Sequence, residues 1–240
     1  MKKIFLKKFK GVILAGGKGT RLYPITLEIP KPLLPVKGKP VINYLVDLFF
    51  QYKIEKIAIL INKKFKEEFE WWKKRFYPKK KFLFVQEKKP LGTMGGLFYL
   101  KEWIGNSPFF LTNGDELKKI DLEKMANFHQ RINALATIAL VKVTNPRDYG
   151  VVVCENGLVK EFLEKPKNPP SNFINAGLYL FSPQIFYYHP GPKFLMLEKD
   201  LFPKLAKEGK LAGFKFRGKW MDTGTFPRYE KAIKSWVFKS

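Results

Sequence analysis

The sequence has little of the chemistry that cysteine and histidine supply, since it contains one cysteine, Cys154, and two histidines, His129 and His189. A single cysteine excludes a disulfide within the chain and argues against a zinc site built on cysteines. No apolar run approaches the ~20 residues that a membrane-spanning helix requires. The basic N-terminal segment is interrupted by lysines, so we do not expect a signal peptide. We therefore expect a soluble, cytoplasmic protein, and we interpret both histidines as structural or surface residues.

Acidic residues and arginines are also scarce. The chain has 45 Lys and Arg against 21 Asp and Glu, a formal net charge of +24, yet only six of the basic residues are arginine. Proteins that read nucleic acids rely on arginine for bidentate and stacking contacts, whereas here lysines are scattered along the whole chain. We interpret the excess charge as a solvated, lysine-rich surface, with a field that steers anionic small molecules as the alternative, and we expect no nucleic-acid partner.

Hydrophobic residues make up 45% of the chain, which is enough for a sizeable core. In the first half, short apolar runs alternate with segments whose apolar residues recur at helical spacing. This pattern predicts strands over 10–15, 56–61, 81–85 and 109–112, and helices over 41–53, 63–76 and 93–103. Phe65, Phe69 and Trp72 lie on one side of the second of these helices, and we interpret them as core anchors.

The second half is richer in strands than in helices. We predict strands over 134–143, 150–153, 158–162, 177–181 and 211–216, and helices over 197–208 and 225–238. The alternation in the first half is typical of a mostly parallel sheet with helices on both faces, and the later strands either extend that sheet or form a smaller lobe. We expect one compact α/β domain over 1–240, with lobes at 1–120 and 121–240.

A glycine-rich loop, LAGGKGTRL, follows the first predicted strand and carries the strongest chemical signal. Glycines let the backbone approach a phosphate or a base, and consecutive amides form anion-binding nests. A P-loop is excluded because Gly19 follows Lys18, and a dinucleotide fingerprint is excluded because Leu22 stands in place of its last glycine. An ordinary glycine turn would explain the glycines, but not the cations Lys18, Arg21 and Lys31 around them.

The chain resembles the family of sugar-1-phosphate nucleotidyltransferases. The stretch LAGGKGTRLYPITLEIPKPLLPVKGKP is similar to the opening signature of that family. The resemblance continues, in the family's order, through PLGTMGG (90–96), NGD (113–115), YGVV (149–152), EKP (164–166), NAGLYLF (175–181), LEKDLFPKLA (197–206) and WMDTGT (220–225). It covers nearly the whole chain and ends before the hexapeptide-repeat β-helix that family members often carry, so we expect the catalytic domain alone.

The resemblance implies a Rossmann-like fold of the nucleotide-diphospho-sugar transferase type and an Mg²⁺-dependent enzyme. The implied reaction converts a nucleoside triphosphate and a sugar 1-phosphate into a nucleotide-sugar and pyrophosphate, with the nucleotide in the lobe 1–120 and the sugar in the smaller lobe 121–240. Its nucleophile is already an anion at neutral pH. Catalysis would therefore rest on positioning and charge neutralisation rather than on a general base.

The same resemblance implies the roles of individual residues. The implied catalytic residues are Arg21, Lys31 and Asp115, and the implied Mg²⁺ ligands are Asp115 and Asp222. The implied nucleotide-binding residues are Leu14, Ala15, Gly16, Gly17, Gly19, Thr20, Arg21, Glu87, Gly92 and Thr93. The implied sugar-phosphate-binding residues are Gly150, Glu164, Lys165 and Asn175. Carboxylate and phosphate oxygens are the ligands that Mg²⁺ prefers, because it is a hard cation.

The choice of base depends on one position. In the family, the residue five positions before Gly92 faces the Watson–Crick edge of the base, and here that residue is Glu87. A carboxylate accepts two hydrogen bonds and matches the N1–H and N2–H₂ donors of guanine, which favours GTP. The motifs also look most like those of mannose-1-phosphate guanylyltransferases. A shift of one residue would place Gln86 there instead, which suits uracil or thymine and leaves uridylyl or thymidylyl transfer to glucose 1-phosphate or a related sugar open.

Two further points stay open at this level. Met196 stands where guanylyltransferase-like members usually have serine, a departure that concerns the sugar or its loop and not the reaction. A catalytically silent regulatory or binding subunit of the same fold is the alternative from another class, but the charged residues Arg21, Lys31, Asp115 and Asp222 are all in place. Many relatives self-associate, so a homo-oligomer is compatible with the sequence.

Overall fold

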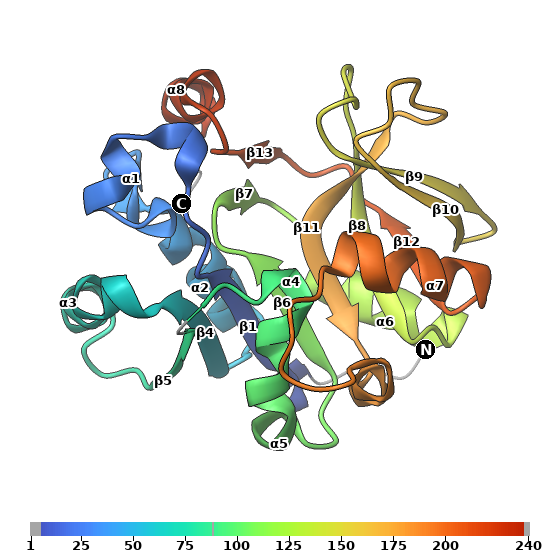
Figure 1. Cartoon of the computed structure of the whole chain (residues 1–240), viewed down its shortest axis with the longest axis horizontal. Coiled ribbons are helices and arrows are strands. Elements are labelled where there is room, and N and C mark those ends of the chain that lie inside the picture. The colour runs from blue at the N-terminus through green and yellow to red at the C-terminus, as the bar shows by residue number, and fades with distance from the viewer. Residues whose placement is uncertain (1–5, 88, 238–240) are drawn as a thin grey trace.

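The computed structural model describes residues 6–87 and 89–237 (Figure 1). Within them, nine strands form one mixed sheet in the order β5-β4-β1-β6-β11-β8-β12-β10-β9. These strands are β1 (Lys10–Ala15), β4 (Lys56–Asn62), β5 (Phe82–Glu87), β6 (Phe109–Asn113), β8 (Ala136–Lys142), β9 (Gly150–Glu155), β10 (Leu158–Glu164), β11 (Phe173–Phe181) and β12 (Leu211–Lys215). Two short ribbons pair β2 (Pro35–Val36) with β3 (Lys39–Pro40), and β7 (Glu116–Lys118) with β13 (Trp220–Asp222).

The first half of the chain forms the parallel part of the sheet, as the sequence predicts. β1 pairs in parallel with β4 and β6, and β4 pairs in parallel with β5. Each of these strands begins and ends within two residues of its predicted bounds. Their carboxyl ends therefore meet at one edge, which is where α/β sheets bind ligands.

The second half extends the same sheet, so the first of the two alternatives left open by the sequence is confirmed. β11 lies antiparallel between β6 and β8, and β12 pairs in parallel with β8. β10 then pairs antiparallel with both β12 and β9. A register break in β11 between Asn175 and Tyr179 interrupts its ladder with β8.

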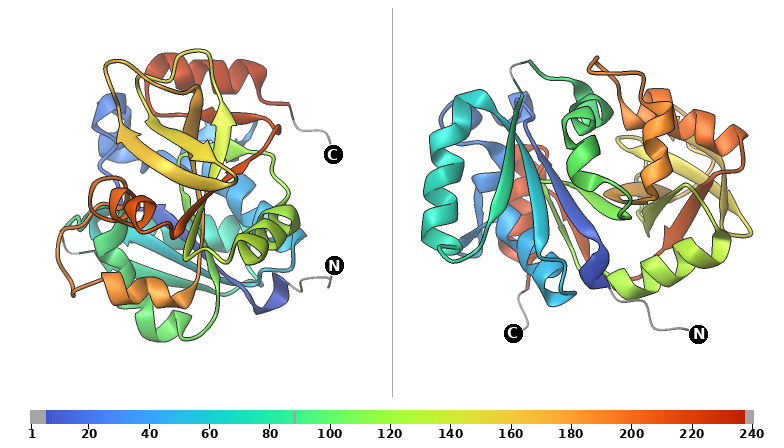
Figure 2. Two further views of the ribbon diagram at one scale, coloured as in Figure 1. Left: turned by 90° about the vertical axis from the view of Figure 1, so that its right-hand side faces the viewer. Right: turned by 90° about the horizontal axis from the view of Figure 1, so that it is seen from below.

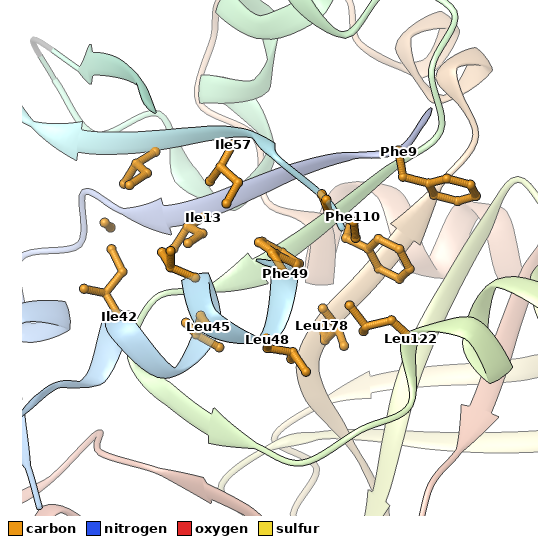
Figure 3. Close-up of a cluster of buried hydrophobic side chains, with 14 of the residues drawn as sticks. Phe9, Ile13, Ile42, Leu45, Leu48, Phe49, Ile57, Phe110, Leu122 and Leu178 are labelled. Carbon is orange, nitrogen blue, oxygen red and sulfur yellow. The ribbon is translucent and has the colours of Figure 1, made fainter. Parts of the chain in front are cut away.

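Helices cover both faces of the sheet (Figure 2). The helices are α1 (Ile25–Glu28), α2 (Val41–Gln51), α3 (Lys66–Phe76), α4 (Gly92–Gly95), α5 (Lys101–Ile104), α6 (Leu122–Ile132), α7 (Phe202–Lys207) and α8 (Phe226–Ser235). One core cluster joins α2, α3 and α6 to the sheet, and a second joins α4, α5 and α7 to it. In the first cluster, Phe49 of α2 is buried beside Phe110 of β6 (Figure 3). Phe65, Phe69 and Trp72 are buried, which confirms them as core anchors.

Three expectations about helices were wrong or incomplete. The predicted helix 93–103 is broken into α4, a 3₁₀ segment and α5, and the predicted helix 197–208 begins with a π-helical turn before α7. α6 was not predicted, although Asp121 caps it and Leu122, Met125 and Ala126 line its buried face. Phe238, the predicted end of the last helix, lies outside the described residues. No helix in the described ranges is long and apolar enough to cross a bilayer.

Candidate active site

The glycine-rich loop after β1 forms the rim of a cavity of about 530 Å³ at the carboxyl edge of the parallel strands. Gly19 adopts a left-handed conformation with φ +66°, and its carbonyl accepts hydrogen bonds from the Leu22 amide at 2.9 Å and the Thr26 hydroxyl at 2.8 Å. These contacts fix the turn that presents Thr20 and Arg21 to the cavity. The loop is therefore held at Gly19 by the residues that follow it.

Most of the residues that the sequence implies for the nucleotide line this cavity. They are Leu14, Gly16, Gly17, Gly19, Thr20, Arg21, Glu87, Gly92 and Thr93, joined by Lys18, Lys31 and Asp115. Ala15 is the exception, because its side chain is buried in the core and leaves only its backbone for a ligand. Phe194 and Met196 form part of the opposite wall. Met196, the position that departs from the guanylyltransferase pattern, thus lies in the pocket itself.

Lys31 and Asp115 form an ion pair in the wall of the cavity. Lys31 lies in a 3₁₀ turn between Pro30 and Pro32, and its ammonium donates a hydrogen bond to Asp115 Oδ2. Its side chain is only 9% exposed, against 31% for Asp115. Burial acts to raise the pKa of the Asp115 carboxyl, but the Lys31 ammonium, a backbone hydrogen bond and the charge of Lys118 together hold that pKa below its ordinary value. A cation and a carboxylate that are 84 positions apart in sequence thus meet at one point.

The loop of Asp115 is fastened to that of Asp222. The amide and the hydroxyl of Thr223 both donate to the Asp115 carbonyl, at 3.1 and 2.8 Å, and β7 pairs with β13 so that Asp222 faces Glu116. At the level of sequence, only the family resemblance predicted that Asp115 and Asp222 lie close together. The structure places their backbones side by side.

The Asp222 carboxylate is held by three groups. Tyr149 donates to Oδ2 at 2.8 Å, the Gly224 amide donates to Oδ1 at 2.9 Å, and Arg228 of α8 approaches Oδ1 at 3.5 Å. Burial, with the Asp222 charge second, raises the pKa of the Tyr149 phenol, which keeps it protonated as a donor. Arg228 was missed at the level of sequence, although it is one of few arginines in a lysine-rich chain.

Asp115 and Asp222 offer donor chemistry that fits Mg²⁺. In proteins this ion is commonly bound by one or two carboxylates together with waters and substrate phosphates. Within the described ranges, no group of three or more His, Cys, Asp or Glu side chains is placed to hold a metal. A divalent ion at these two aspartates would therefore depend on phosphate oxygens of a ligand for its remaining coordination.

Glu87 reaches the cavity from the end of β5, while Gln86 is exposed and does not line it. A Cβ on Gly16 would lie 2.6 Å from one carboxylate oxygen of Glu87, and a Cβ on Gly96 would lie 2.7 Å from the other. Burial raises the pKa of this carboxyl, and the Leu91 amide at 3.4 Å acts in the opposite direction. The structure thus directs Glu87, and not Gln86, toward the cavity.

The residues implied for the sugar gather beyond this cavity, on β9, β10 and β11. β9 pairs with β10 so that Gly150 faces Glu164, and β9 also touches β11 one residue before Asn175. Lys165 is 59% exposed and lies 3.6 Å from Glu164. The Asn175 side chain accepts from the Gly177 amide at 3.0 Å and donates to the Tyr179 hydroxyl at 2.9 Å. None of these four implied residues lines the 530 Å³ cavity.

Glu198, whose carboxyl lies between the cavity and the residues implied for the sugar, was not singled out at the level of sequence. Glu198 accepts a hydrogen bond from Thr93 at 2.7 Å. Burial raises its pKa, and the nearby charge of Glu164 acts in the same direction. The LEKD motif carried this residue, but nothing in its spacing showed that it turns inward.

The chain is similar to proteins that transfer nucleotides. The profile of the nucleotidyl transferase family matches residues 10–236. The mannose-1-phosphate guanylyltransferase catalytic subunit beta of Xenopus tropicalis is 36% identical over 229 residues, which cover 90% of this chain and 61% of that protein. The chain thus spans less than two thirds of the length of this relative.

Solved structures share the fold over nearly the whole chain. A candidate glucose-1-phosphate thymidylyltransferase from Bacillus anthracis, in complex with a sucrose, has a TM-score of 0.86 at 28% identity and covers 97% of this chain and 98% of its own. HddC from Yersinia pseudotuberculosis, complexed with GMP-PN, has a TM-score of 0.80 at 28% identity, with coverage of 94% and 98%. With the profile match over residues 10–236, the chain belongs to the nucleotidyl transferase family.

Proposed function

We propose that this protein transfers a nucleotidyl group from a nucleoside triphosphate to a sugar 1-phosphate in the presence of Mg²⁺, with GTP and mannose 1-phosphate as the favoured pair. The observation that carries the proposal is the Lys31–Asp115 ion pair in a cavity rimmed by a glycine-rich loop. The family match and the guanylyltransferase relative support the same reaction class.

The reaction forms one bond and breaks one bond at the α-phosphorus. A phosphate oxygen of the sugar 1-phosphate attacks, and pyrophosphate leaves from the opposite side. The attacking oxygen is anionic at neutral pH, so no side chain has to remove a proton. His129 and His189 are correspondingly engaged elsewhere, the first with Thr137 and Ser182 and the second with the Met94 carbonyl.

The chain's own groups supply cations and donors where charge gathers. The loop amides from Gly16 to Arg21 and the Arg21 guanidinium would hold the β- and γ-phosphates. Lys31 would lie between the α-phosphate and the sugar phosphate and offset the repulsion between two anions. Asp115 and Asp222 would hold Mg²⁺, which when bound screens and orients phosphate oxygens.

The sugar would bind beside this cavity, against β9, β10 and β11. Glu164 and Glu198 offer carboxylates for hydroxyl groups, and Asn175 keeps one N–H and one lone pair beyond its contacts with Gly177 and Tyr179. Lys165 would contact the sugar phosphate, since its side chain is exposed and only loosely paired with Glu164.

The base is the least constrained part of the proposal. Glu87 presents a carboxylate that accepts two hydrogen bonds, which matches guanine, and a neighbouring structure carries GMP-PN. Thymidylyl transfer is the second candidate, because the structure with the TM-score of 0.86 is a candidate glucose-1-phosphate thymidylyltransferase.

The test is pyrophosphate release with Mg²⁺ across ATP, GTP, UTP and dTTP and a panel of sugar 1-phosphates. We expect the fastest release with GTP and mannose 1-phosphate. Release with UTP or dTTP alone would keep the reaction class and overturn the guanine assignment. No release with any pair would overturn the enzyme and favour a catalytically silent subunit.

Glu87→Gln tests the base assignment within the same assay. The carboxylate of Glu87 offers an acceptor for each of two donors of guanine, and the glutamine amide offers only one. One donor of the bound base would then lack a partner, so we expect kcat/KM with GTP to fall by at least about tenfold. Gln86→Ala is the matched control, because Gln86 is exposed on the same strand and should leave kcat/KM unchanged. Equal values for the two variants would show that Glu87 does not read the base.

A further inference from the structure

A buried ion pair that the proposed chemistry does not use lies on β7, directly after Asp115. The side chain of Lys118 is 0% exposed, and its ammonium lies 3.3 Å from Glu116, which is 9% exposed. Removing two charges from water costs free energy that their attraction offsets only when hydrogen bonds complete the arrangement. A buried pair is therefore weak evidence for stability, and its hydrogen bonds show what it holds in place.

The Lys118 ammonium joins two strands of the main sheet. It donates to the Thr112 hydroxyl of β6 at 2.9 Å and to the Gly177 carbonyl of β11 at 3.0 Å. With Glu116 as the third neighbour, each of its three N–H groups has an acceptor. Gly177 lies in the register break of β11, and its amide donates to the Asn175 side chain at 3.0 Å. Lys118 therefore contacts the residue whose amide holds the Asn175 side chain.

The Glu116 carboxylate contacts the end of β6 and the start of β13. It accepts from the Asn113 amide group at 2.9 Å and from the Trp220 indole at 2.8 Å. Trp220 begins β13, the strand that ends at Asp222. Gly177 has φ +56°, and a Cβ there would lie 2.1 Å from Glu116 Oε1, so the carboxylate occupies space that a side chain would take. The Glu116 carboxylate therefore fits beside the break in β11 because residue 177 is glycine.

We propose that the Glu116–Lys118 pair positions Asp115, Asp222 and Asn175 relative to one another, so that the proposed metal ligands and the sugar asparagine form one site. This inference rests on the proposed function. Neither side chain lines the cavity that the glycine-rich loop rims. They act through Gly177 on the sugar side and through Trp220 on the side of Asp222.

The test is the double variant Glu116→Gln/Lys118→Met, which removes both charges while nearly keeping side-chain volume. Removing both partners of a buried pair commonly leaves a protein folded, whereas removing one does not. We expect kcat to fall and the KM for the sugar 1-phosphate to rise, each by about tenfold, as for other residues that orient ligating groups. The KM for GTP should stay within about twofold, because the glycine-rich loop is untouched.

Asn43→Leu serves as the control for a purely structural effect, since it removes a buried hydrogen bond to Trp72 in the α2–α3 layer. If a variant only lowers the fraction of folded protein, kcat falls and both KM values stay constant. The positioning role is overturned if the double variant has the same melting temperature as Asn43→Leu and shows only a lower kcat, with both KM values unchanged.

Binding without turnover separates this inference from the proposed function. In calorimetry, we expect the wild type to bind GDP-mannose more tightly than GDP, and the double variant to bind GDP normally but GDP-mannose no more tightly. A double variant that keeps the full gain from the mannose moiety overturns the positioning role. If the wild type binds GDP-mannose no more tightly than GDP, the mannose assignment is overturned. The positioning role is then decided by comparing the kcat and KM values of the wild type and the double variant, measured with the substrate pair that the wild type turns over.

Discussion

At the scale of single residues, the imidazole of His129 shows how burial sets a group's chemistry. Its two nitrogens lie 2.7 Å from the Thr137 hydroxyl and 3.0 Å from the Ser182 hydroxyl, and burial lowers its pKa to about 4. An unfolded chain binds a proton at this residue near pH 6.5, whereas the folded protein does not until about pH 4. The unfolded state is therefore favoured progressively as the pH falls between these values.

We predict that the free energy of unfolding loses on the order of 3 kcal/mol through His129 between pH 6.5 and 4. Urea unfolding at pH 7, 5.5 and 4.5 would measure the loss. His129→Gln is the control, because it keeps a neutral side chain at every pH and should show a smaller decrease. Parallel pH profiles for the two proteins would rule out the neutral, buried histidine.

The roles of residues could be predicted where the residues lie in one continuous motif. They could not be predicted where the interacting residues are far apart in the sequence. The glycines and Lys31 were readable because they lie within one continuous stretch. Glu116 and Lys118 were not, because a Glu and a Lys two positions apart in a chain with +24 net charge are ordinary surface residues by composition. Only the approach of β11 and β13 buries them.

At the scale of elements, the segment after the predicted third strand shows why a helical pattern was broken. Gly92 has φ +79°, and a Cβ there would lie 2.3 Å from the Leu195 carbonyl. That carbonyl accepts hydrogen bonds from the Met94 and Gly95 amides at 3.0 and 3.2 Å. The docking of residues 193–196 against this turn replaces regular helix, and a single-sequence pattern contains no trace of a contact so distant in sequence.

Gly92→Ala should lose both stability and activity, because the methyl group meets backbone that cannot move away easily and the left-handed conformation adds about 1 kcal/mol or more of strain. Gly17→Ala should keep stability, since its Cβ would meet nothing within 4 Å, but should raise the KM for GTP by occupying the cavity. Melting temperatures and KM values would check both.

Gly38→Ala completes this comparison. Gly38 has φ +85° with open space around its Cβ, and it lies in the turn between β2 and β3, so the variant should lose stability from backbone strain alone. If Gly92→Ala resembles Gly38→Ala in both melting temperature and kcat/KM, the contact with Leu195 does not shape the site.

At the scale of the whole molecule, the parallel half of the sheet could be predicted and the order of the other half could not. Alternation of strands and helices restricts β1, β4, β5 and β6 to parallel neighbours with right-handed connections. β11, in contrast, lies between β6 and β8 through pairings that no local signal marks. The two lobes at 1–120 and 121–240 stay a prediction, since the sheet is continuous across both halves and Phe194, Met196 and Gly224 line the same cavity as the glycine-rich loop.

The net charge of +24 acts on the same scale. A positive field attracts nucleoside triphosphates and sugar phosphates, and salt screens it over about 8–10 Å at physiological ionic strength. We predict that kcat/KM with GTP falls at least about threefold when KCl rises from ~50 to ~300 mM, with kcat nearly constant. A kcat/KM that does not depend on salt would show that the lysines only solvate the surface.

The most direct test of the central claim, that Lys31 beside Asp115 promotes transfer at the α-phosphate, is the rate of pyrophosphate formation by Lys31→Met at saturating substrates. Removing a group that stabilises developing charge costs about 10²–10³ in kcat, and we expect a loss in that range, measured well below the lowered melting temperature of the variant, with GDP affinity close to that of the wild type. A Lys31→Met protein that keeps kcat within about threefold of the wild type would contradict this account of the site.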